Sequence, residues 1–127
     1  MDNPAQKPFI SIYTSKGDTD AFLVYPYIFN RSGEWIGWVT SRREVYSVIG
    51  YYVGYLSDDP RILRKRATST LKPRLNPPPA PEPIRVPATV PLAPMLSELT
   101  YSIIDVLSEE PERLHTLELG EFRQDLD

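Results

Sequence analysis

Hydrophobic residues in the first half of the chain occur in short runs separated by glycine-containing turns. Three runs share one pattern: a β-branched residue, an aromatic residue, three residues, a glycine, three residues, then a small, an aromatic and an aliphatic residue. The aligned glycines are Gly17, Gly33 and Gly50, which lie sixteen and seventeen residues apart. This self-similarity predicts a repeat architecture, in which each copy is one structural unit.

Each copy predicts a β-hairpin. β-Branched and aromatic pairs suit strands, and the glycine ends a three-residue connection of the kind that requires a left-handed residue. Strand alternation places the third and fifth residues after the glycine on one face, and the fourth and sixth on the other. Because both faces carry apolar groups, we expect both to be covered.

A fourth, fainter copy follows the third. Ile62 and Leu63 stand at the β-branched and aromatic positions, Ala67 replaces the glycine, and Leu71 takes the small position. Four hairpins around a shared axis would close on themselves and remove exposed sheet edges. The sequence therefore predicts a mainly β protein, with a small closed array or barrel of hairpins over residues 9–71 after a tail of residues 1–8.

The repeat, clearest from Ile28 and Phe29 through Gly33, Gly37 and Trp38, resembles that of the bacterial four-fold beta-flower proteins. The resemblance covers roughly residues 9–71, and a basic stretch and a proline-rich tail follow. It implies a fold and no chemistry, because that family is defined by its fold and has no established activity. A weaker similarity is to PRC-barrel domains, which are small β-barrels that act as binding modules.

Proline divides the rest of the chain. Nine of the fourteen prolines lie within residues 73–94, which predicts an extended polyproline II linker over residues 72–93, acting as a spacer or a strap. An alternative interpretation is a ligand for an SH3-like groove, through the Pro-x-x-Pro spacings at Pro78 and Pro91.

Residues 94–127 are expected to form an acidic helical segment that docks on the hairpin domain, on a second copy of the chain or on another protein. Pro94 suits a first helical residue. Apolar residues then recur at helical spacing, at Met95, Leu96, Leu99, Ile103, Val106 and Leu107. A second short helix is predicted from Ser108, with Pro111 in its first turn and Gly120 as its end.

The composition of the 127 residues is that of a globular protein, with 41% hydrophobic and 24% charged residues. The absence of cysteine excludes disulfides and thiolate metal sites. With His115 as the single histidine and no nucleophile pattern around it, we predict neither an enzyme nor a cofactor or metal site. No signal peptide or membrane span is predicted, so we expect a soluble, cytoplasmic protein without membrane contact.

Charge is distributed unevenly along the chain. Residues 1–97 hold twelve basic and eight acidic residues, a net of +4, whereas residues 98–127 hold two basic and nine acidic residues, a net of −7. One hypothesis is a nucleic-acid-binding β-barrel that uses the basic run. Its candidate residues are Arg61, Arg64, Lys65, Arg66, Lys72 and Arg74. The sequence pI of about 5.2 and the acidic tail, which could neutralise this surface, argue against it.

The hypothesis that we favour is a non-enzymatic interaction or assembly module that binds an unidentified protein partner or a second copy of itself. The rings of Trp35, Tyr51 and Tyr52 are expected either to form stacking surfaces or to pack between hairpins. Val48 and Ile49 place two aliphatic residues at a tip where a solvated turn would be polar, so we expect the C-terminal helix or a partner to bury them. The candidate partner-binding residues are Trp35, Val48, Ile49, Tyr51, Tyr52, Leu99, Ile103 and Val106.

Overall fold

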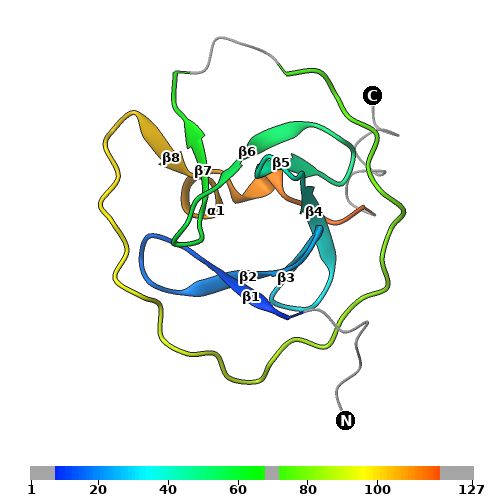
Figure 1. Ribbon diagram of the computed structural model, residues 1–127, viewed down its shortest axis with the longest axis horizontal. Helices are drawn as coiled ribbons and strands as arrows, with labels where there is room; N and C mark the ends of the chain where they lie inside the picture. Colours follow the sequence, from blue (N-terminus) through cyan, green and yellow to red (C-terminus); the bar gives the residue numbers. More distant parts are fainter. Residues whose placement is uncertain (1–7, 68–71, 118–127) are drawn as a thin grey trace.

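A computed structural model describes the structure of residues 8–67 and 72–117. In these residues, eight antiparallel strands pair in chain order and form one sheet that curls into a half-barrel (Figure 1). The strands are β1 (Ile10–Tyr13), β2 (Thr19–Val24), β3 (Tyr27–Asn30), β4 (Trp35–Val39), β5 (Glu44–Ser47), β6 (Tyr52–Leu56), β7 (Ile62–Lys65) and β8 (Ile103–Asp105). A helical turn α1 (Val106–Glu109) and a 3-10 turn η1 (Pro111–Arg113) follow. The prediction of a mainly β fold is confirmed.

Three hairpin tips share one geometry. We name them tip 1, tip 2 and tip 3, at Gly17, Gly33 and Gly50. Their glycines have φ values of 91°, 82° and 92°, in the left-handed region that a side chain disfavours. Each glycine N–H donates to the carbonyl three residues earlier, at 2.9, 3.0 and 2.9 Å. The predicted repeats and the role of these glycines are therefore confirmed.

The register of each hairpin shifts at the same place. Between the β-branched and aromatic residues of each copy, the pairing skips one residue of the second strand: Asp20, Ile36 and Val53. These are the third residues after each glycine, and they are the extra residues of β-bulges. The bulge directs the side chains of Ile36 and Val53 into the aliphatic core that also contains Val39 and Leu56. The expectation that the third and fifth residues share a face is therefore wrong.

The fourth hairpin joins segments that are distant in the sequence. β7 pairs with β8, with Leu63 opposite Asp105 and Lys65 opposite Ile103. The Arg66 N–H donates to the Ser102 carbonyl at 2.7 Å and extends the pairing. The second strand of this hairpin thus comes from residues 103–105, while the position of Leu71 lies outside the described residues.

Residues 72–102, here called the strap, run around the outside of the sheet without helix or strand (Figure 1). The long amphipathic helix expected from Pro94 is wrong. Leu92 and Met95 are 95% and 98% exposed, and Ile103–Asp105 is a strand. Without β8, the edge of β7 would present unpaired N–H and C=O groups. A strand at residues 103–105 pairs these groups and buries Ile104, whereas a helix would leave them unpaired. Helix begins only at Val106, and the predicted second helix appears as the 3-10 turn η1, with its expected end at Gly120 outside the described residues.

Two apolar clusters cover the two faces of the sheet. The inner core contains aliphatic residues of the strands together with Val106, Leu107 and Leu114 from the C-terminal segment. The outer cluster is aromatic, and residues of the strap pack against it. Its buried members are Phe29, Trp35, Trp38, Tyr46 and Val48. The prediction that both faces are covered is confirmed, and the strap is what covers the outer one.

Candidate functional site

The strap binds two of the three hairpin tips in the same way. The Leu75 N–H donates to the Gly50 carbonyl at 3.0 Å, and the Ile84 N–H donates to the Gly33 carbonyl at 3.0 Å. At each tip the strap main chain lies directly against the glycine. A Cβ atom on Gly50 would overlap the Leu75 carbonyl oxygen, and one on Gly33 would overlap the Ile84 carbonyl oxygen. Tips 2 and 3 are therefore equivalent docking sites for an extended segment.

Proline explains why the strap bonds to the hairpin tips through single residues and does not form a strand. Leu75 lies between Pro73 and Pro77, and Ile84 follows Pro83. Because proline has no N–H, it cannot donate a ladder hydrogen bond, and it holds the backbone extended. The amide donors that remain reach the glycine carbonyls, while the aliphatic side chains pack on the aromatic cluster. The Tyr27 hydroxyl also donates to the Pro79 carbonyl at 2.7 Å.

Most of the residues predicted to bind a partner are covered by the chain itself. Trp35 and Val48 are 8% and 2% exposed within the aromatic cluster, and Val106 is fully buried in the inner core. For these three residues the structure shows packing within the chain, because the strap and the C-terminal segment cover the faces on which they lie. Ile49 and Tyr52 are half-buried and pack against the same cluster.

Three other predicted partner residues lie outside both apolar clusters. Tyr51 is 57% exposed at tip 3, where the Arg74 guanidinium lies 5.6 Å from its ring centroid. Leu99 and Ile103 are half-buried and line a cavity described below. The structure therefore brings Leu99 and Ile103 together, but places Tyr51 elsewhere.

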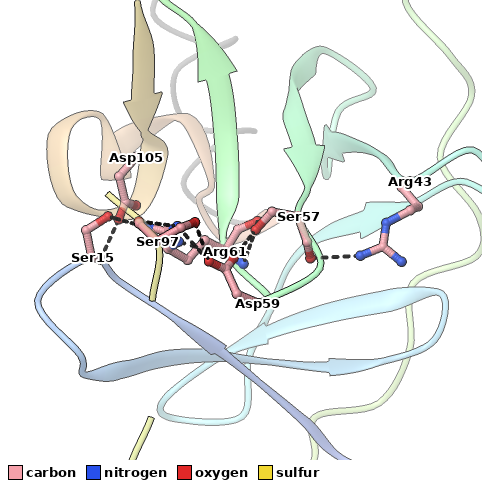
Figure 2. Close-up of polar contacts among 7 residues, drawn as sticks. All are labelled: Ser15, Arg43, Ser57, Asp59, Arg61, Ser97 and Asp105. Atoms are coloured by element: carbon pink, nitrogen blue, oxygen red, sulfur yellow. Dashed lines mark hydrogen bonds and ion pairs between the residues drawn. The ribbon is translucent and has the colours of Figure 1, made fainter. Parts of the chain in front are cut away.

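Arg61, predicted to contact nucleic acid, is 1% exposed. Its guanidinium forms an ion pair with Asp59 at 2.6 Å and donates to the Ser15 hydroxyl and the Ser97 carbonyl, both at 2.9 Å (Figure 2). The Ser15 N–H and hydroxyl in turn both donate to Asp105 at 2.6 Å. This network ties together tip 1, the β6–β7 turn, β8 and the strap, so the nucleic-acid interpretation is wrong for Arg61. The short Asp59-x-Arg61 spacing was the available sequence signal.

Other basic candidates are paired within the chain. Arg64 contacts Glu110 at 2.8 Å and Arg66 contacts Glu109 at 3.3 Å, so the acidic segment does neutralise the basic run. Lys72 contacts Glu44 at 2.7 Å, and Arg74 donates to the Ile49 carbonyl at 2.6 Å. Lys65 lies exposed on β7.

These pairs change the ionisation of the carboxylates. Burial opposes the charged form of Asp59, but hydrogen bonds from Arg61 and Ser57 outweigh it and lower the pKa. Burial also opposes the charge on Glu110, and hydrogen bonds from Arg64 and Arg113 lower its pKa. Both carboxylates are thus held ionised by their structural partners.

Tip 1 differs from tips 2 and 3. Nothing lies within 4 Å of a Cβ position built on Gly17. Here the strap makes no contact with the glycine, and an open cavity of about 570 Å³ lies beside the tip. Ser15 and Lys16 of tip 1 line one side, and Leu96 and Leu99 of the strap line another.

Two polar atoms near tip 1 lack partners. Asp105 lines the cavity, and its Oδ1 atom has no hydrogen-bond partner among the described residues; neither does the hydroxyl of buried Thr14. Since buried polar atoms are normally hydrogen-bonded, this region is less completely satisfied than the other tips.

The strap beside the cavity is apolar and exposed. Val90 is 38% exposed, and Leu92, Met95 and Tyr101 are 95%, 98% and 82% exposed. The contact between Arg61 and Ser97 holds this segment in place, and Arg66 donates to the Tyr101 carbonyl at 2.7 Å. Leu92 and Met95 lie between the strap contacts of Ile84 and Ser97, so the apolar segment is held on both sides.

Within residues 8–67 and 72–117, no group of three or more His, Cys, Asp or Glu side chains could hold a metal ion. No helix in this part of the chain has the length and apolar character needed to cross a membrane. Comparison of the chain with protein-family models, curated proteins and solved structures finds no match.

Proposed function

We propose that the protein is a non-enzymatic interaction module, and that a protein partner binds the exposed apolar strap segment of residues 90–101 together with the adjacent cavity. The observation that carries this proposal is the almost complete exposure of Leu92 and Met95 on a segment anchored at Ser97. Large apolar side chains gathered on a fixed surface are typical of interaction sites. Membership of the four-fold beta-flower family is part of the same proposal, supported by four hairpins in succession.

Anchoring favours binding. A disordered segment must lose conformational entropy when it binds, whereas a segment already held in one conformation loses less. Arg61 supplies two contacts to Ser97, and Arg66 stacks at 4.3 Å over the Tyr101 ring. The buried arginine therefore serves recognition indirectly, by presenting the strap.

The test compares the full chain with a Leu92→Ser/Met95→Ser variant in affinity capture from the native source. Because both side chains are almost fully exposed, the variant should unfold at the wild-type urea concentration. A Glu82→Ser/Thr89→Ser variant, at exposed polar positions of the strap, is the matched control.

We expect a partner that the wild type and the control retain and that the apolar variant loses. Sedimentation velocity of the purified chains distinguishes a second copy from another protein, since self-association would then depend on Leu92 and Met95. Equal retention of every partner by all three chains, with identical sedimentation, would refute the proposal.

A further inference from the structure

We propose that tip 1 binds an extended, proline-flanked segment of the partner in the way that tips 2 and 3 bind the strap of the chain itself. This inference rests on the proposed function and names the chemistry of the partner segment. The chain contains three copies of one docking geometry, of which the strap occupies two. The third is the open tip beside the apolar strap segment and the cavity.

Tip 1 has the features that receive the strap at the other tips. Gly17 has the same left-handed conformation, and its N–H donates to Thr14 as the equivalent groups do at tips 2 and 3. Among the described residues no donor reaches the Gly17 carbonyl, which is the atom that accepts the strap N–H at Gly33 and Gly50. The space above Gly17 is open where the other two tips contact the strap carbonyls.

The strap of the same chain does not fill this position. Beyond Ile84 no described strap residue contacts Gly17, and Ser97 reaches tip 1 only through Arg61, which also donates to Ser15. Since no described residue of the chain bonds the Gly17 carbonyl, we assign its occupant to another molecule.

The two internal complexes define the ligand. In each, an aliphatic residue donates its N–H to the tip glycine, an arginine stands next to it, and prolines flank the pair: Pro73-Arg74-Leu75 and Pro83-Ile84-Arg85. The proline-fixed backbone lowers the conformational entropy lost on binding. At tip 1 the aliphatic side chain would enter the cavity against Leu96 and Leu99.

The experiment uses the full chain and a labelled peptide with the sequence of residues 81–88, Pro-Glu-Pro-Ile-Arg-Val-Pro-Ala. Binding is followed by fluorescence anisotropy, and the contacted residues are mapped by amide chemical-shift changes. Two control peptides replace Ile84 with serine or carry an N-methyl group on its amide, which removes the donor. Gly17→Asn fills the open tip with the residue that best tolerates a left-handed backbone after glycine, and Ser41→Asn, exposed in the β4–β5 turn, is its control.

We expect shifts centred on residues 15–18 and on the cavity, with binding weakened at least about tenfold, or roughly 1.4 kcal/mol, by Gly17→Asn and by N-methylation. Ser41→Asn should bind as the wild type does. If Gly17→Asn fails to fold, the N-methylated peptide and the shift map still decide the matter.

Two outcomes would overturn the inference. One is absence of binding at millimolar peptide. The other is a shift pattern confined to Gly33 and Gly50, which would mean that the peptide only displaces the strap. Loss of a captured partner in the Leu92→Ser/Met95→Ser variant, combined with no peptide binding, would leave the proposed function standing and remove the inference alone.

Discussion

Substituting alanine for the tip glycines measures how much the strap stabilises the fold. Gly33→Ala and Gly17→Ala introduce the same methyl group at nearly the same backbone conformation, with φ of 82° and 91°. Both variants bear the cost of a side chain in a left-handed conformation, about 1–2 kcal/mol. Only at Gly33 would the methyl group collide with the strap, through the Ile84 carbonyl oxygen.

The free energy lost through this collision can be estimated from the contacts that it breaks. Moving the strap away breaks the Ile84 N–H bond to Gly33, worth about 1 kcal/mol. It also exposes Ile84, which is half-buried against the aromatic cluster; half of a full burial of about 1.5–3 kcal/mol is about 1 kcal/mol. Gly33→Ala should therefore be about 2 kcal/mol less stable than Gly17→Ala.

Urea unfolding followed by tryptophan fluorescence measures this difference, because Trp35 and Trp38 both belong to the cluster that the strap covers. Hydrogen exchange of the Ile84 amide gives a local measure and should accelerate in Gly33→Ala while staying slow in Gly17→Ala. Equal stability of the two variants, with an equally protected Ile84 amide, would mean that the strap does not dock at tip 2 and would refute the reasoning.

Further predictions concern the buried charges and the inner core. Arg61→Met should destabilise the fold by about 3 kcal/mol, since it leaves the Asp59 charge without its buried partner, and urea unfolding at pH 7 measures this. The folded-state pKa values of Asp59 and Glu110 lie below the unfolded ones. The stability that these two carboxylates contribute is therefore present above about pH 4–5 and disappears as the pH falls through the folded pKa values. The urea midpoint should drop on acidification, and should drop less in Glu110→Gln. Gly37→Ala should cost about 1–3 kcal/mol, because its methyl group would crowd the Tyr46 carbonyl oxygen at 2.8 Å, and an unchanged melting temperature would contradict this.

Local chemistry explains which parts of the fold were predictable. Gly17, Gly33 and Gly50 identify the tips because a tight turn with a left-handed residue strongly favours glycine. The bulge was not predictable, since nothing in a strand sequence marks Ile36 as the extra residue of the pair. Once it is inserted, simple alternation assigns the wrong face to that position.

Contacts between residues far apart in the sequence explain the predictions that were wrong. Leu99 and Ile103 have helical spacing, but the open edge of β7 selects a strand at residues 103–105, and local periodicity carries no information about that edge. The burial of Arg61 likewise depends on Ser15 and Ser97, which are far from it in the chain. Of the candidate site, Leu99 and Ile103 were predicted, whereas the open tip required the path of the strap.

The path of the strap also has a consequence for folding kinetics. Closing a loop of about 40 residues between β7 and β8 costs roughly 2 kcal/mol more entropy than closing one of about four residues. Docking of the strap at Gly50 and then at Gly33 divides this loop closure into shorter steps. The strap thus reaches tip 3 before tip 2, the reverse of their order along the chain. β8 should therefore pair last, and the rate-limiting contacts in refolding should include Leu75 and Ile84, in a segment that contributes no strand to the sheet.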